Sequence, residues 1–149
     1  MTSGNGKVFI AWKNVFLDTA PLIYFIEGHS EYQEVLSRTF DANEKKDFIF
    51  ITSSITLLEV LVKPLKDGNT KLAEQYKNIL INAPGIELPE VTHEVAIKAA
   101  ELRAKYNLRT PDSIQIATAI VTKASSFLTN DVRLKSVGEL KIVALGELE

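Results

Sequence analysis

Apolar residues recur along the chain with two alternating periods. Short runs rich in valine, isoleucine and phenylalanine, such as "NVFLD" (14–18) and "DFIFITS" (47–53), have the composition of buried strands. Longer stretches between these runs carry apolar residues at every third or fourth position, which is typical of amphipathic helices. Strand and helix patterns that alternate in this way favour a parallel sheet covered by helices on both faces. The sequence therefore predicts an α/β fold.

The same pattern predicts where each element begins and ends. A short edge strand follows Gly85, and we expect Pro64 to bend or end the helix in which it stands. The predicted strands cover 14–18, 47–53, 86–91, 126–130 and 141–148. The predicted helices cover 20–28, 30–46, 55–67, 70–82, 93–106 and 111–124, with a short helix at 131–138.

The composition is that of one globular domain. Of the 149 residues, 46% are hydrophobic and 24% are charged, and no repeat or Gly/Ser-rich linker divides them. We expect residues 1–13 to form a flexible N-terminal lead and residues 14–149 to form a single domain. No run has the pattern of a membrane span or a signal peptide, and the absence of cysteine suits the reducing cytoplasm.

Four acidic residues stand where predicted elements begin or end, or where an apolar run is interrupted. Asp18 ends the first strand, Asp131 follows the fourth, and Asp112 opens a helix directly after a proline. Glu59 interrupts the apolar run of another helix. Ligands of open parallel sheets bind beyond the carboxyl ends of the strands, where the strand order reverses. If the first and fourth strands are neighbours there, these acids share one crevice.

Each acid also has an ordinary structural explanation. Asp18 and Asp112 suit helix starts, Asp131 suits a turn, and Glu59 suits a wet helix edge. Carboxylates that share a crevice nevertheless repel one another unless a counter-charge is present, and no lysine or arginine adjoins Asp18 or Glu59 in the sequence. A hard divalent cation such as Mg²⁺ or Mn²⁺ compensates such a cluster through its oxygen ligands.

Other signatures of catalytic chemistry are missing from the sequence. His29 and His93 stand alone without the spacing of a zinc site, and neither a glycine-rich phosphate loop nor a G-x-S-x-G elbow occurs. The net charge of −2 neither requires nor excludes a nucleic-acid substrate, because bound cations supply local positive charge. Three cationic residues beside the acids are either contacts for RNA phosphates or ordinary solvated side chains: Arg109, Arg133 and Lys135.

Four stretches resemble motifs of the PIN-domain nucleases, in particular of the VapC-like toxins of prokaryotic toxin–antitoxin pairs. They are "VFLDTAPLIYFIEG", "TSSITLLEVL", "ELRAKYNLRTPDSIQIATAI" and "SFLTNDVRL", and they carry Asp18, Glu59, Asp112 and Asp131 in the family's order. The third stretch is the most specific of the four. The resemblance extends over about residues 15–145, which is nearly the whole chain.

The resemblance implies a three-layer α/β/α fold with five parallel strands in the order 3-2-1-4-5. It also implies an endoribonuclease that depends on one or two Mg²⁺ or Mn²⁺ ions. Ala20 departs from the polar residue often found after Asp-Thr in this family, and the last acidic position is aspartate where many relatives carry asparagine. The implied catalytic metal ligands are Asp18, Glu59, Asp112 and Asp131, supported by hydrogen bonds from Thr19 and Thr129.

A VapC-like toxin is expected to act on RNA, to bind a small antitoxin protein and to form a homodimer. PIN domains also process RNA without an antitoxin, and the same fold can serve as a non-catalytic binding module. The acid-rich α/β phosphatases and phospho-receivers form another class, which Ala20 and the serines after "FIFIT" disfavour. Acids at all four positions favour the nuclease over the binding module.

Overall fold

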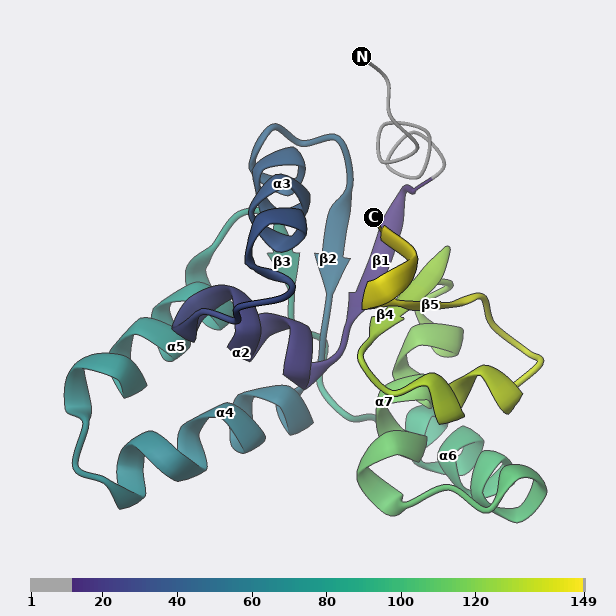
Figure 1. Cartoon of the computed structure of the whole chain (residues 1–149). Helices are drawn as coiled ribbons and strands as arrows, with labels where there is room; N and C mark the ends of the chain where they lie inside the picture. The colour runs from purple at the N-terminus through teal and green to yellow at the C-terminus, as the bar shows by residue number, and fades with distance from the viewer. Residues whose placement is uncertain (1–11, 149) are drawn as a thin grey trace.

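Five parallel strands form one sheet in a computed structural model that describes residues 12–148. From the central strand the chain proceeds outward to one edge, and then it crosses back to the other edge (Figure 1). The order β3-β2-β1-β4-β5 confirms the strand order expected from the sequence. The strands are β1 (Asn14–Leu17), β2 (Ile49–Ile51), β3 (Ile86–Glu87), β4 (Ser126–Thr129) and β5 (Ile142–Ala144).

The central strand β1 is apolar because helices cover both of its faces. Val15, Phe16 and Leu17 are all fully buried, as expected for a strand in the middle of a parallel sheet. Phe16 pairs in register with Phe127 of β4, and their rings stack with centroids 4.9 Å apart. This contact joins the two strands whose carboxyl ends carry Asp18 and Thr129.

Helices pack on both sides of the sheet, since successive side chains of a strand point to opposite faces (Figure 1). Val15 and Leu17 belong to the core formed with the first four helices, and Phe16 belongs to the core formed with the last two. The helices are α2 (Thr19–Glu27), α3 (Gln33–Glu44), α4 (Ser54–Lys66), α5 (Thr70–Asn82), α6 (His93–Tyr106) and α7 (Thr110–Val121), with the 3₁₀ helices η1 (Val132–Ser136) and η2 (Leu145–Leu148).

The C-terminal strand is shorter than predicted. The strand predicted over 141–148 ends at Ala144, and the chain then turns into η2. Leu145 and Leu148 are buried by this turn, and the Glu147 carboxylate accepts a hydrogen bond from the Ala144 N–H at 2.8 Å. Burial of two leucines at the sheet edge therefore ends the strand early. Pro64 lies within the last turn of α4, which ends two residues later.

The predicted N-terminal lead lies mostly outside the described residues. Its last two residues, Trp12 and Lys13, contact the second strand and the residue before it. The Trp12 ring is buried and packs edge-on against Phe48 at 5.1 Å, and the Lys13 carbonyl accepts a hydrogen bond from the Ile49 N–H. Trp12 and Lys13 therefore pack against the domain, and the rest of the predicted lead lies outside the described residues.

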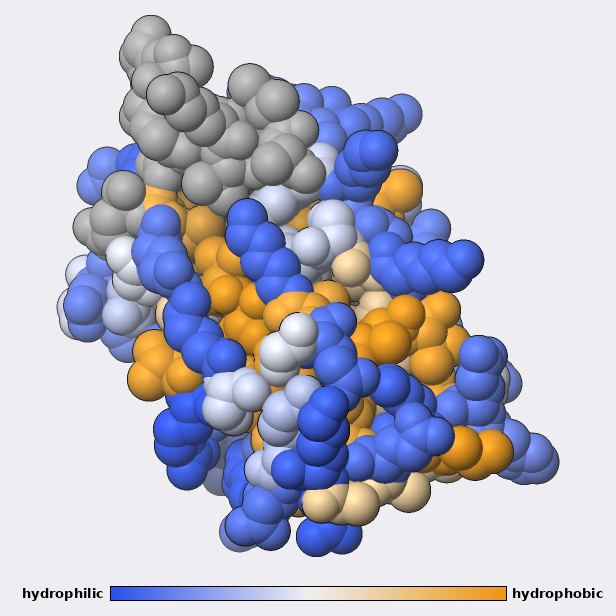
Figure 2. All heavy atoms as spheres, turned by 90° about the vertical axis from the view of Figure 1, so that its right-hand side faces the viewer, coloured by the Kyte–Doolittle hydropathy of each residue, from blue (hydrophilic) through white to orange (hydrophobic). Residues whose placement is uncertain are grey.

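The surface carries long hydrophilic side chains that lie across apolar ones. On the face seen from the β5 side, blue hydrophilic groups and orange apolar groups are interspersed (Figure 2). Charged side chains with long aliphatic stems cover apolar surface in this way while their heads stay in water. None of the helices within residues 12–148 is long and apolar enough to cross a membrane.

A close approach at Gly85 connects α3 to the starts of β2 and β3. The buried Asn43 amide donates hydrogen bonds to the carbonyls of Phe48 and Gly85, at 3.1 and 2.9 Å. A Cβ atom at position 85 would lie 2.9 Å from Asn43 Oδ1. We expect Gly85→Ala to displace this amide and to lower the free energy of unfolding by about 1–3 kcal/mol, measured by urea titration.

Gly146→Ala is the matched control for this change, because a Cβ atom there has no heavy atom within 4 Å. Equal urea midpoints for the two variants would show that Asn43 moves aside without cost.

Candidate active site

Four carboxylates from four different parts of the chain line one cleft. The cleft has a volume of about 560 Å³ and lies beyond the carboxyl ends of β1 and β4. The strand order reverses between these two strands, which is where open parallel sheets bind their ligands. Its lining residues are Asp18, Thr19, Ala20, Ile23, Glu59, Arg109, Asp112, Thr129, Asn130 and Asp131.

Asp18 has a structural role and a place in the cleft at the same time. Its backbone N–H continues the sheet by donating to the Leu128 carbonyl at 3.0 Å. Its carboxylate is the N-cap of α2, because Oδ1 accepts from the Thr19 N–H at 2.9 Å. The other oxygen, Oδ2, accepts from the Thr129 hydroxyl at 2.7 Å. The capping role expected as the alternative explanation therefore coexists with exposure to the cleft.

Burial raises the pKa of Asp18 above its ordinary value. Hydrogen bonds from Thr129 and Thr19 oppose the change, while the negative charges of Asp112 and Glu59 add to it. Like charges disfavour ionisation of a carboxyl group, and a cation bound beside them reverses that effect. The environment of Asp18 therefore favours either a proton or a positive ion in the cleft.

Thr129 connects two of the acids. Its hydroxyl donates to Asp18 and accepts from the backbone N–H of Asp131 at 3.0 Å. Asp131 in turn caps η1 through the Arg133 N–H at 3.0 Å. The hydrogen bonds and charge of Arg133 hold the pKa of Asp131 below its ordinary value.

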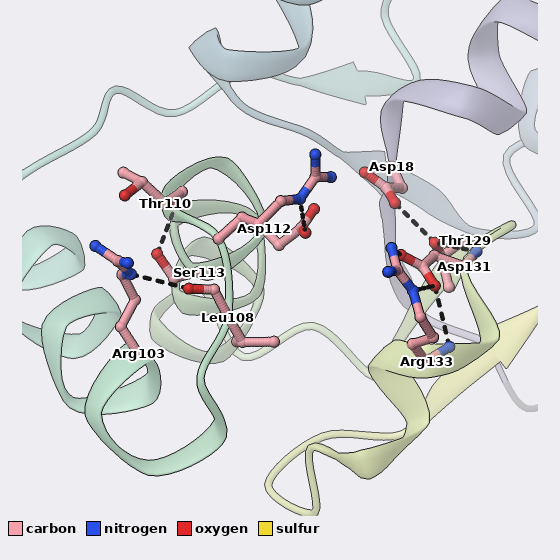
Figure 3. A network of polar contacts seen from close by, with 10 residues as sticks. Asp18, Arg103, Leu108, Thr110, Asp112, Ser113, Thr129, Asp131 and Arg133 are labelled. Carbon is pink, nitrogen blue, oxygen red and sulfur yellow. Dashed lines mark hydrogen bonds and ion pairs between the residues drawn. The ribbon is translucent and has the colours of Figure 1, made fainter.

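Asp112 approaches the cleft from the opposite side. It lies in the first turn of α7 and faces Asp18 and Thr129 across the open space (Figure 3). Its side chain is 16% exposed and forms an ion pair with Arg109, whose Nε lies 3.1 Å from Asp112 Oδ2. A carboxylate in this first turn is also stabilised by the helix dipole.

Glu59 is connected to α7 through a chain of mostly buried polar groups behind the cleft. The Thr19 hydroxyl donates to Glu59 Oε1 at 2.5 Å and lies 3.2 Å from the Thr56 hydroxyl. Thr56 accepts from the Gln115 amide at 2.6 Å, and Gln115 accepts from the Ser53 hydroxyl.

Sequence reasoning missed Thr56 and Gln115. A signal was present, because Thr56 is three residues before Glu59 and Gln115 is three residues after Asp112. That spacing puts each polar residue on the same helix face as its acid.

The cationic residues separate into two groups. Arg109 lines the cleft, and Arg133 is bound to the cleft residue Asp131. Lys135 is not brought to this site, because its ammonium group pairs with Glu147 at 2.6 Å and donates to the Ile142 carbonyl. Only the two arginines are therefore placed to meet a ligand of the cleft.

The donor chemistry of the cleft suits a hard divalent cation, since every candidate ligand is a carboxylate. Within residues 12–148, however, no three acidic, histidine or cysteine side chains are arranged as they stand to hold a metal ion. The carboxylates instead accept hydrogen bonds from threonines, backbone and arginines. A metal ion would have to draw them together by side-chain rotation.

An α/β domain with an acidic cleft at its topological switch point is thus the class of protein that the fold and the site define. The family model described as "PIN domain" matches residues 15–140, so the chain belongs to the PIN domain family. No curated protein matches the chain.

Solved structures share the fold at low sequence identity. The chain is similar to VapBC2 from Rickettsia felis bound to a promoter DNA fragment, with a TM-score of 0.71 and 18% identity over 88% of this chain and 98% of that one. FitAcB from Neisseria gonorrhoeae has a TM-score of 0.69 and 17% identity, covering 89% and 98%. VapC20 from Mycobacterium tuberculosis, a sarcin–ricin loop cleaving toxin, has a TM-score of 0.69 and 14% identity, covering 85% and 98%.

Because its pKa is raised, ionised Asp18 lowers the free energy of unfolding of the metal-free protein. Folded Asp18 keeps its proton to a higher pH than the unfolded chain does, so its contribution to stability falls as pH rises through that interval. In chelator at pH 7 we expect Asp18→Asn to raise Tm by about 2–4 °C, the shift that roughly 1 kcal/mol produces in a domain of this size. The gain should vanish in acid, where Asp18 is protonated in both states.

Glu147→Gln is the control, because the Lys135 pair lowers the pKa of Glu147 and the same substitution there brings no gain. If Asp18→Asn, like Glu147→Gln, gave no increase in Tm at pH 7, this explanation of the raised pKa of Asp18 would be wrong.

Proposed function

We propose that the protein is a divalent-metal-dependent endoribonuclease that hydrolyses RNA phosphodiester bonds, and that it acts in the cytoplasm as the toxin of a VapBC-type pair. The observation that carries the proposal is the convergence of Asp18, Glu59, Asp112 and Asp131 on one cleft. Membership of the PIN domain family supports the same chemistry.

The four carboxylates would hold one or two Mg²⁺ or Mn²⁺ ions, some of them through water, because four direct anionic ligands exceed what one Mg²⁺ usually takes. Such an ion would supply the positive charge that lowers the pKa of water, so that water can lose a proton and attack a phosphodiester near neutral pH. Thr129 fixes the rotamer of Asp18, and Thr19 fixes that of Glu59. Arg109 stands at the rim of the cleft, where a guanidinium group suits an RNA phosphate.

The similar solved structures support the toxin assignment. VapC20 is described as a toxin that cleaves the sarcin–ricin loop. A similar structure from Klebsiella pneumoniae is described as a toxin–antitoxin complex, and VapBC-5 from Mycobacterium tuberculosis as a member of the VapBC family of toxin–antitoxin systems. By analogy this chain is proposed to bind a small antitoxin protein.

The exposed apolar residues of α4 support a partner on that face. Leu58, Val62 and Leu65 are 60%, 51% and 61% exposed, and their spacing places them on one side of the helix. Ile81 of the neighbouring helix α5 is 58% exposed. Contiguous exposed apolar side chains are typical of protein interfaces. We propose that this face contributes to a homodimer.

Cleavage of RNA tests the chemistry. With Mg²⁺ or Mn²⁺ present, we expect the wild-type protein to cleave a single-stranded RNA, and Asp18→Asn and Asp112→Asn to slow cleavage by about 100-fold or more. Glu147→Gln is the matched control, since Glu147 lies on η2 with its carboxylate paired to Lys135. Wild-type-like cleavage by both cleft variants would refute the proposed mechanism.

The oligomeric state tests the α4 face. Light scattering should give the wild-type chain twice its mass of 16.6 kDa, and the double variant Val62→Lys/Leu65→Lys should give the single mass. Two buried ammonium groups would make association unfavourable. Ile97→Lys serves as the control, because Ile97 is 63% exposed on α6, which covers the opposite face of the sheet. A double variant that remains dimeric would exclude this face as the interface.

A further inference from the structure

Two of the four carboxylates in the cleft are already bound by cationic side chains of the same chain. Asp131 is engaged through both oxygens, because Arg133 Nε lies 2.9 Å from Oδ1 and Arg133 Nη2 lies 2.8 Å from Oδ2 (Figure 3). This is the two-pronged geometry in which guanidinium binds carboxylate most strongly.

The other acids are held less firmly. Asp112 receives one hydrogen bond from Arg109, at 3.1 Å. Asp18 and Glu59 are held by uncharged donors, namely threonine hydroxyls and a backbone N–H. Among the four acids of the cleft, Asp131 is therefore the one bound by a guanidinium group through both of its oxygens.

The exposed position of Arg133 allows its guanidinium group to move away from Asp131. Its side chain is 79% exposed, whereas that of Asp131 is 26% exposed. The backbone N–H of Arg133 holds Asp131 independently of the guanidinium group, at 3.0 Å. Rotation of the arginine would therefore release both carboxylate oxygens from the guanidinium group, while Oδ1 keeps the backbone hydrogen bond that caps η1.

We propose that Arg133 is a latch on the cleft: its guanidinium group competes with the divalent ion for Asp131, and an RNA phosphate releases it. This inference rests on the proposed function, because it assigns a regulatory role within the same site. Guanidinium binds phosphate with the same two-pronged geometry that it uses for carboxylate. Phosphate that takes Arg133 away leaves Asp131 free to bind metal.

Binding of metal and phosphate should consequently be coupled. Linkage requires that a phosphate which tightens metal binding is itself bound more tightly when metal is present. The charge of Arg133 also acts on Asp112, so its departure changes the potential at a second carboxylate of the cleft. Without RNA the latch keeps metal affinity low, and with RNA the site becomes complete.

Binding of Mn²⁺ alone to the full chain tests the latch without any cleavage reaction. The free ion is measured by electron paramagnetic resonance for the wild type and for Arg133→Gln. We expect Arg133→Gln to bind Mn²⁺ about three- to tenfold more tightly, because it removes a bidentate but partly solvated pair. Arg109→Gln removes a single contact and should have a smaller effect.

Lys135→Gln is the matched control for the loss of one positive charge. Lys135 lies two residues further along η1, but its ammonium group faces Glu147 and not the cleft. Mn²⁺ affinity should change by less than about twofold in this variant, since exposed charges at a distance are screened. If Arg133→Gln and Lys135→Gln increased Mn²⁺ affinity equally, the increase would come from the change in net charge, and the latch would be wrong.

Dimethyl phosphate, a small phosphodiester, tests the release step. Saturating dimethyl phosphate should tighten Mn²⁺ binding to the wild type by more than it does for Arg133→Gln. The same increase in both proteins would show that phosphate does not act through Arg133, and the latch would be wrong.

Asp18→Asn separates failure of the latch from failure of the proposed function. If wild type and Asp18→Asn bind Mn²⁺ equally, the cleft is not a metal site and both proposals fall. If Asp18→Asn weakens binding while Arg133→Gln leaves it unchanged, the metal site stands and only the latch is overturned.

Discussion

Mutual repulsion of carboxylates at the end of a parallel sheet is the constraint on which the rest of this structure depends. The order of the strands puts the ends of β1 and β4 side by side, and this brings Asp18 next to the segment that carries Thr129 and Asp131. α7 adds Asp112, and α4 adds Glu59. A fold that gathers so much negative charge must offset it locally, and every hydrogen bond described in the cleft contributes to that offset.

Two kinds of hydrogen-bond donor offset the negative charge of the carboxylates. Threonine hydroxyls hold Asp18 and Glu59 without adding charge, and the N-terminal N–H of α2 also donates to Asp18. Arginines hold Asp112 and Asp131 and add a positive charge to each. The uncharged donors fix the two acids that are most closely tied to the sheet and to α4, whereas the charged donors sit on the exposed rim. The centre of the cleft thus stays anionic, and its edge is cationic.

Local sequence patterns were sufficient to predict an α/β fold and the positions of the acids at element ends, whereas the strand order was predicted from the resemblance to the PIN-domain nucleases. Asp18 follows an apolar strand, and Asp112 follows a proline at a helix start, so both positions depend on neighbours in the sequence. Local spacing puts Thr56 and Gln115 on the same helix faces as the acids, but the hydrogen bond between them depends on how α4 packs against α7. Arg133 and Lys135 follow Asp131 by two and four residues, yet Arg133 pairs with Asp131 at the cleft whereas Lys135 pairs with Glu147. Contacts of this kind follow from tertiary geometry.

The chain of polar groups behind the cleft connects α4 to the opposite wall of the cleft. Glu59 belongs to the same helix as Leu58, Val62 and Leu65, and Thr56 on that helix is bonded to Gln115 of α7. A protein bound to the outer side of α4 would therefore contact the same helix that contributes Glu59 to the cleft. A displacement of that helix by a fraction of its pitch would misalign a carboxylate on one wall relative to its counterpart on the other. A partner on the outer side of α4 would therefore contact the helix that carries Glu59 without having to fill the cleft itself.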